Sequence, residues 1–231
     1  MIKAEKHSNN FDAIRLILAL SVMIFHSSVL FNSSILGKFN IGSVVQCFFI
    51  ISGYLIFQSY ERSKSLKDYV IKRAKRLFPG LWFCIFLTCI LGAFLTNLPL
   101  NEYFGKDLVK YLIGNSSTLN FLSPRLPGVF VDNPESGFVN GSLWTIKVEL
   151  FFYISVPILF YIFKKRILLG IIFALAITTI YKFFCIQFGS FLELKFGNAI
   201  YKAIFDPYTN PLANMTFFLC GSLFYYLRDL V

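Results

Sequence analysis

The sequence FDAIRLILALSVMIFHSSVLF, residues 11–31, decides the fold class of this 231-residue chain. Residues 16–37 contain no Asp, Glu, Lys or Arg, and a helix of that length crosses the roughly 30 Å hydrocarbon core of a bilayer. His26 lies inside this stretch and Arg15 lies near its start. An ionisable side chain within a spanning helix indicates a functional site. We therefore expect a membrane protein whose chemistry involves this first helix.

The spacing of Arg15 and His26 places both side chains on one face of that helix. They are eleven positions apart, which is about three turns plus ~20°, with an axial rise of roughly 16 Å, or half the bilayer core. This geometry suits a reagent that enters at one membrane face and reacts deeper in. We predict that His26 is catalytic, either as a general base toward a hydroxyl or as a nucleophile that carries an acyl group. The structural alternative is a histidine whose partner is a neighbouring helix.

The composition supports the membrane assignment, because 56% of the residues are hydrophobic and 19% are aromatic, unusually high for a soluble domain. We expect one integral membrane domain over residues 1–231, with no second, soluble domain. The apolar run near the N-terminus is too long for a cleavable signal peptide. The five cysteines are odd in number and form no CxxC pair. We therefore expect neither a disulfide framework nor a metal site, and the cysteines are interpreted as small apolar core residues.

Hydrophobic runs along the chain predict an all-α, polytopic protein with about six transmembrane helices. The predicted segments cover residues 14–31, 41–60, 81–98, 143–163, 167–184 and 212–227.

The distribution of basic residues predicts a cytoplasmic N-terminus and C-terminus. With that orientation 14 of the 22 Lys and Arg residues lie on the cytoplasmic side, mostly in short loops, where the positive-inside rule is strongest. The formal net charge of +10 is thus a topology signal, and we expect no nucleic-acid partner. Membrane lipid is an expected partner.

A basic cluster precedes the third segment in the sequence DYVIKRAKRLFPG, residues 68–80. Arg73 and Arg76 are spaced i,i+3 and share one helical face, and Pro79 marks the entry to the segment. Guanidinium groups bind phosphates bidentately, so these two arginines are predicted to hold a nucleotide-containing donor at the cytoplasmic side. The alternative is a pair of anchors on anionic lipid.

The fourth segment is short, because only residues 150–163 are free of charge, about 21 Å of helix. To span the membrane, its helix must begin near Leu143 and bring Lys147 and Glu149 into the outer leaflet, which requires partners or a wet cavity. Glu149 is predicted to support catalysis by orienting or compensating His26 or Arg15, or by binding acceptor hydroxyls. The alternative is a local pair with Lys147, although i,i+2 neighbours do not face each other on a helix.

Two further features of the sequence lead to structural predictions. The Ser52-Gly53 step within the bulky second segment predicts close helix packing, or else room for a thin substrate arm beside the first helix. Residues 101–112, in the long outer loop 99–141, have the apolar pattern of a short interfacial helix.

Four of these pieces together resemble the acyltransferase-3 family of bacterial membrane acyltransferases. The pieces are FDAIR with a histidine eleven residues after its arginine, FFIISGYLI (48–56), RxxR before a proline (73–79) and GSLWTIKVELFFY (141–153). The resemblance covers about residues 11–153. It implies transfer of an acyl group, usually acetyl from cytoplasmic acetyl-CoA, to a sugar hydroxyl of a cell-surface glycan or its lipid-linked precursor. It further implies that Arg15 and His26 are essential and that Arg73 and Arg76 lie near the donor.

The resemblance therefore predicts an acyl-CoA-dependent O-acyltransferase of the bacterial inner membrane, with acyl-CoA as a donor substrate and no permanently bound cofactor. Family members usually have more transmembrane helices than the six predicted here, so the chain is either a short member or lacks a C-terminal part. Position 46 is Gln, where family members often have an acidic residue. The rivals are a transporter or glycan-export component, with His26 and Glu149 lining a proton or substrate path, and an inactive truncated acyltransferase.

Overall fold

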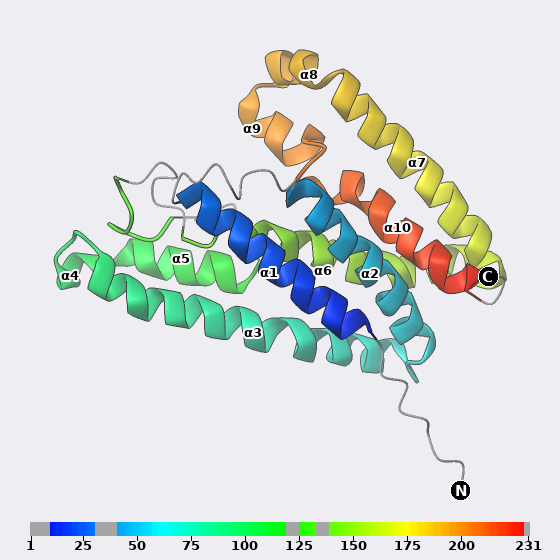
Figure 1. Cartoon of the computed structure of the whole chain (residues 1–231), viewed down its shortest axis with the longest axis horizontal. Helices are drawn as coiled ribbons and strands as arrows, with labels where there is room; N and C mark the ends of the chain where they lie inside the picture. The colour runs from blue at the N-terminus through cyan, green and yellow to red at the C-terminus, as the bar shows by residue number, and fades with distance from the viewer. Residues whose placement is uncertain (1–9, 31–40, 119–124, 133–138, 229–231) are drawn as a thin grey trace, which may run out of the picture. The chain divides into compact units, whose positions relative to one another are not determined.

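The computed structural model describes residues 10–30, 41–118, 125–132 and 139–228. Every regular element in these ranges is helical (Figure 1), which confirms the all-α prediction. The chain divides into two compact units. The first contains residues 1–58 and 158–231, and the second contains residues 59–157. Two long helices, α2 (Ile41–Glu61) and α6 (Trp144–Phe163), contribute to both units.

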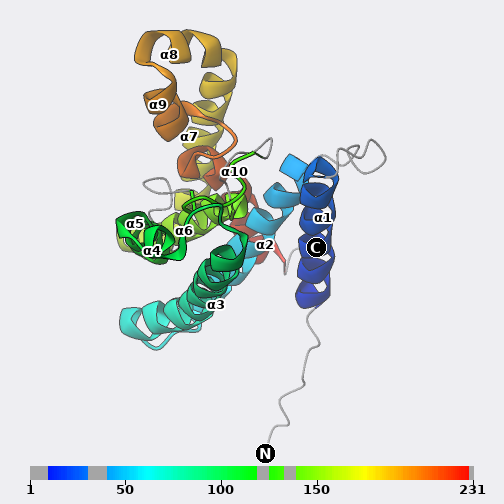
Figure 2. The same cartoon turned by 90° about the vertical axis from the view of Figure 1, so that its left-hand side faces the viewer.

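The first unit contains α1 (Phe11–Leu30), most of α2, the end of α6 and the C-terminal helices. α7 and α10 pack side by side, while α8 and α9 gather at the C-terminal end of α7 (Figures 1 and 2). The C-terminal elements are the 3-10 turn η3 (Lys164–Arg166), α7 (Ile167–Gln187), α8 (Gly189–Phe196), α9 (Asn198–Ile200), the π-helical turn η4 (Tyr201–Phe205) and α10 (Pro211–Leu227).

Two glycines bring the backbones of α2 and α10 into direct contact. A Cβ atom at Gly53 would meet the carbonyl oxygen of Phe218, and one at Gly221 would meet the carbonyl oxygen of Ile50. Beside them, Ser52 is buried. The predicted close packing at the Ser52-Gly53 step is confirmed, and it follows the small-residue rule for helices that associate in membranes.

The second unit is built on α3 (Leu66–Leu95), α4 (Leu100–Tyr103), α5 (Lys106–Ser116), the 3-10 turn η2 (Gly141–Leu143) and most of α6. Ser65 caps α3, because its hydroxyl accepts a 3.1 Å hydrogen bond from the Asp68 N–H. The helix then continues through Pro79. The third apolar helix therefore begins at Leu66, not near residue 81, and its first three turns carry the basic cluster.

The predicted interfacial helix over residues 101–112 is two helices: α4 lies at the end of α3, and α5 runs back along α3 (Figure 1). The Tyr103 hydroxyl donates 2.7 Å to the Cys89 carbonyl, and Trp82 Nε1 donates 3.3 Å to the Ser116 carbonyl. The apolar side chains of Tyr103, Leu108 and Tyr111 are buried in one core with Leu81, Ile85 and Cys89 of α3. The apolar face of α4 and α5 is thus covered by other parts of the protein.

Asn140 fixes the start of the fourth apolar segment. Its Nδ2 donates to Thr88 Oγ1 of α3 at 3.1 Å and to the Tyr111 hydroxyl of α5 at 3.2 Å. η2 and α6 follow directly, so the helix begins where the sequence required it, near Leu143, and includes Lys147 and Glu149.

Burial raises the pKa of Tyr111 to about 12 and that of Tyr103 to about 12, because a phenolate is poorly solvated there.

Three stretches of the described residues are long and apolar enough to cross a membrane: Gly42–Glu61, Leu66–Leu95 and Gly141–Gln187. The third is two helices, because φ of Lys164 is +44° and the ring of Phe163 lies 6.3 Å from that of Phe173, far closer than ten residues of one straight helix allow. The described part of the chain is thus all-helical, and its long apolar helices are those of a membrane protein. The count of six spans and the cytoplasmic N-terminus stay predictions.

Candidate functional site

Arg73 is the centre of a polar cluster in the second unit. It lies in the second turn of α3, half-buried, and its Nη2 donates a 2.7 Å hydrogen bond to the hydroxyl of Ser59. Its Nε and Nη1 are buried and have no hydrogen-bond partner among the described residues. A buried guanidinium is costly unless its charge and its donors are paired. The Nε–H and Nη1–H groups point to different sides of the guanidinium, so each can donate to a separate oxygen of an anion.

Two tyrosines hold the guanidinium in place. The Cζ atom of Arg73 lies 5.9 Å from the ring centroid of Tyr69 and 5.6 Å from that of Tyr153, within the range of cation–π attraction. The Tyr69 hydroxyl donates 3.0 Å to the backbone carbonyl of Tyr153 and so joins α3 to α6. Both tyrosines are buried, so their rings have fixed positions against the guanidinium.

Glu149 is connected to this cluster by a hydrogen bond with Tyr153. The Tyr153 hydroxyl donates a 2.5 Å hydrogen bond to Glu149 Oε1 one turn earlier on α6. The structure thus brings two of the predicted site residues to one tyrosine side chain: Arg73 lies over the ring of Tyr153, and Glu149 accepts from its hydroxyl.

Arg76 follows Arg73 by three residues on the same helix, as predicted, but it is exposed. Lys72 is also exposed and pairs with Asp68 at 2.7 Å. The start of α3 therefore combines one enclosed arginine with a basic surface. Exposed charges attract a polyanion over some distance but contribute little binding energy each.

Arg15 and His26 both lie on α1, in the first unit. The helix is continuous between them, so the predicted shared face holds as helix geometry. His26 is exposed, and its ring lies edge-on to Phe25 at 5.7 Å. Arg15 is half-buried. Their catalytic roles stay predictions.

An apolar cavity lies beside the start of α1. Its volume is about 400 Å³, and its lining includes Phe11 of α1, Tyr54 of α2, and Phe224, Leu227 and Arg228 at the end of α10. The cavity begins next to the Ser52-Gly53 step, where the sequence left open the passage of a thin substrate arm.

Sequence reasoning did not assign roles to Ser59, Tyr69 or Tyr153. The available signal was spacing, since Tyr69 precedes Arg73 by four residues and Tyr153 follows Glu149 by four, the separation at which helical side chains meet. The sequence did not show that these faces of α3 and α6 pack against each other.

Comparisons with known proteins agree with the resemblance found in the sequence. A family model described as an acyltransferase domain, of the acyltransferase-3 type, matches residues 8–231. An O-acetyl transferase of Shigella phage Sf6 is 36% identical over 151 residues, which are 64% of this chain and 44% of that protein. Nodulation protein 10 of Rhizobium leguminosarum bv. viciae is 31% identical over 173 residues, 69% of this chain and 46% of that protein.

The chain spans about half the length of the curated relatives it matches. No solved structure matches it.

Proposed function

The chain belongs to the acyltransferase-3 family, and on that premise we propose that it transfers an acyl group, acetyl in the first instance, from acyl-CoA to a hydroxyl. The proposed acceptor is a cell-surface glycan or its lipid-linked precursor, and the proposed location is the bacterial inner membrane. The name of the phage relative, an O-acetyl transferase, supports the choice of acetyl. The basic inner-side residues support a cytoplasmic start of α3, where acyl-CoA is available.

The observation that carries the proposal is that two buried donors of Arg73, Nε and Nη1, have no hydrogen-bond partner among the described residues. Coenzyme A is a polyanion, and guanidinium N–H groups bind phosphate oxygens through strong, charge-assisted hydrogen bonds. We assign one donor phosphate to Arg73, with Arg76 and the neighbouring lysines attracting the rest of the polyanion.

Within the first unit, the apolar cavity beside α1 suits the thin part of the donor. Pantetheine is narrow and carries few charges, which suits an apolar lining with Phe11 and Tyr54 on its walls. In this proposal the charged head stays at the membrane face while the thioester lies deeper, along the helix that carries Arg15 and His26.

For the chemistry we assign the general base to His26, with Arg15 and Glu149 in support. The acceptor hydroxyl loses its proton to His26 and attacks the thioester carbonyl carbon. The carbon–sulfur bond breaks, the thiolate takes up a proton and leaves as the free thiol, and an ester remains on the acceptor. If His26 is instead the nucleophile, the acyl group passes through the imidazole in two such steps.

The testing experiment measures acetyl-CoA-dependent labelling of surface glycan, with release of free thiol, in cells that express the protein. Wild type is compared with His26→Ala, and Met23→Ala on the same exposed part of α1 is the control. We expect label and thiol from wild type and the control, and a loss of about 10²-fold or more in His26→Ala, the size of a general-base contribution. Both variants should accumulate normally, because both side chains are exposed.

The same experiment distinguishes an acyltransferase from a transporter. A transporter would release no thiol from acetyl-CoA even when the protein is present in the membrane. Full transfer by His26→Ala would refute the role of that histidine while leaving the acyltransferase assignment intact.

A further inference from the structure

We infer that Tyr153 is a positioning residue that links the donor-binding arginine to Glu149, and that its ring and its hydroxyl have separable functions. The inference rests on the proposed acyl transfer and deepens it. Its basis is that one buried side chain touches both groups: the ring lies 5.6 Å from Arg73 Cζ, and the hydroxyl donates 2.5 Å to Glu149 Oε1.

The ring of Tyr153 acts on the arginine. With Tyr69 it forms an aromatic wall within 6 Å of the guanidinium, while Ser59 takes the Nη2 hydrogen bond. These contacts fix the plane of the guanidinium and leave Nε and Nη1 for the ligand. A fixed, pre-oriented guanidinium loses less side-chain entropy when it binds an anion, so the ring should set the affinity for the donor.

The hydroxyl of Tyr153 acts on the carboxylate. Glu149 is half-buried in α6, and its carboxylate would otherwise choose among several rotamers. The hydrogen bond from the same helix, one turn later, selects the rotamer that points along α6 toward Tyr153. The hydroxyl should therefore affect the step that Glu149 supports, and not the binding of the donor phosphate.

Position 153 is itself fixed by the opposite helix. The Tyr69 hydroxyl donates to the Tyr153 carbonyl at 3.0 Å, and the Tyr153 side chain is only 5% exposed. Tyr153 thus has a defined backbone position, a covered ring and a partnered hydroxyl, which is what a positioning role requires.

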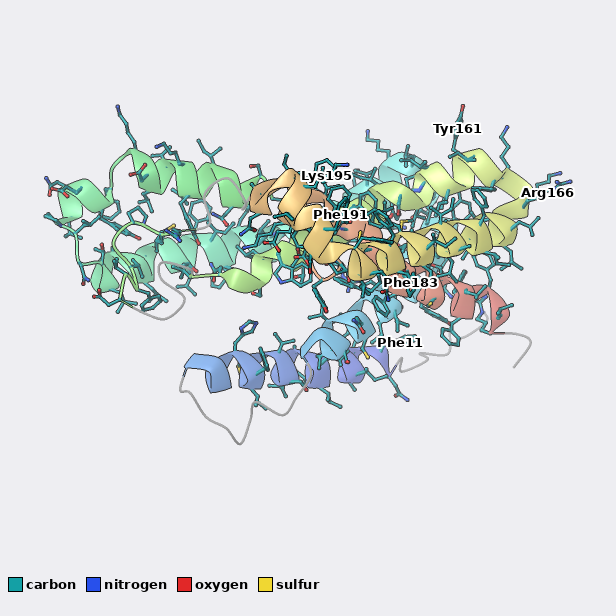
Figure 3. All side chains as sticks on the ribbon, turned by 90° about the horizontal axis from the view of Figure 1, so that it is seen from above. Phe11, Tyr161, Arg166, Phe183, Phe191 and Lys195 are labelled. Atoms are coloured by element: carbon teal, nitrogen blue, oxygen red, sulfur yellow. The ribbon has the colours of Figure 1, made fainter. Side chains whose placement is uncertain are left out.

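The test compares Tyr153→Phe, which keeps the ring, with Tyr153→Leu, which removes ring and hydroxyl. Tyr161→Phe is the matched control. Tyr161 lies eight residues later on α6, is 79% exposed and points away from the ribbon (Figure 3). For each full-length protein in native membranes, kcat and the KM for acetyl-CoA are measured by thiol release.

We expect Tyr153→Phe to lower kcat about tenfold or more, the effect of one lost hydrogen bond to an ionisable group, with the donor KM changed less than about twofold. Tyr153→Leu should also raise the donor KM about tenfold, because Arg73 loses the aromatic ring that orients its guanidinium. Tyr161→Phe should match wild type.

A second pair of variants keeps the inference testable if Tyr153→Phe does not accumulate. Glu149→Asp shortens the side chain so that it no longer reaches the Tyr153 hydroxyl, and Glu149→Gln removes its charge. We expect Glu149→Asp to lower kcat about tenfold or more at unchanged donor KM. In a Glu149→Gln background, Tyr153→Phe should cost less than about twofold more, since a residue that acts through another is not additive with it.

The inference is overturned if Tyr153→Phe has the kcat of Tyr161→Phe, if it raises the donor KM at unchanged kcat, or if Glu149→Asp keeps the wild-type kcat. A wild-type protein that is present in the membrane and releases no thiol overturns the proposed function and this inference together. An active wild type with an unaffected Tyr153→Phe overturns the inference alone.

Discussion

The Tyr69 hydroxyl donates a 3.0 Å hydrogen bond to the backbone carbonyl of Tyr153, 84 residues further along the chain. In an α-helix that carbonyl accepts from the N–H four residues later, and here residue 157 is a proline inside α6, which has no N–H. The proline of one helix thus creates the acceptor that a tyrosine of another helix occupies. This bond aligns α3 with α6 at the level of Arg73 and Glu149.

Tyr69→Phe should lower the free energy of unfolding by about 1–3 kcal/mol, because a buried carbonyl loses its donor. In a Pro157→Ala background the loss should be smaller, since the restored N–H of residue 157 can satisfy the carbonyl. Unfolding in detergent by heat or denaturant measures both values. Equal losses in the two backgrounds would contradict this account of the proline.

Arg73→Lys should raise the KM for the acyl donor about tenfold or more, because an ammonium on a flexible stem cannot present several donors in the fixed plane of a guanidinium. Arg76→Lys is the matched control. Arg76 is exposed and acts through screened charge, which lysine keeps, so its KM should change less than about threefold. The measurement is the donor dependence of thiol release. A larger effect at Arg76 than at Arg73 would move the proposed phosphate site to the helix surface.

Gly53→Ala should destabilise the first unit by about 1–3 kcal/mol, the usual cost of overpacking, because its Cβ would meet the carbonyl of Phe218. Gly80→Ala is the control within α3, where a Cβ meets nothing within 4 Å. That change should stabilise by about 0.5–1 kcal/mol, since alanine is the better helix former. Thermal unfolding of both variants in detergent measures the difference, and opposite signs are expected. A neutral Gly53→Ala would mean that α2 and α10 separate easily.

The α4–α5 region should lose stability as the pH rises from about 10 to about 12. Burial raises the pKa of Tyr111 to about 12 in the folded protein, above its ordinary value near 10, so the folded state holds the phenolic proton more tightly. The stabilisation is complete below pH ~10 and is lost as the pH passes through the folded value.

Helical circular dichroism followed against pH measures this loss. Tyr111→Phe removes one ionising group and should move the transition to higher pH, whereas Tyr208→Phe, at a tyrosine that is 71% exposed, should not. A transition unaffected by Tyr111→Phe would show that other tyrosines control alkaline unfolding.

The sequence by itself determined the fold class and the start of the fourth apolar segment, because both follow from local rules. Charge-free runs require helices in a bilayer, and the short charge-free part of the fourth segment required its helix to begin near Leu143. The face shared by Arg73 and Arg76, and the close approach at Gly53, followed from helical periodicity and residue size in the same way. The third segment began earlier than its hydropathy indicated, because the Ser65 cap starts a helix that a proline at position 79 does not end.

Only the tertiary structure decided which helix faces meet. That α4 and α5 pack against α3, that Tyr69 reaches the carbonyl freed by Pro157, and that Tyr153 contacts both Arg73 and Glu149 depend on contacts between residues up to 84 positions apart. Periodicity identifies an apolar or polar face but not its partner, because many pairings bury similar areas, and the choice among them rests on complementary packing across the whole unit.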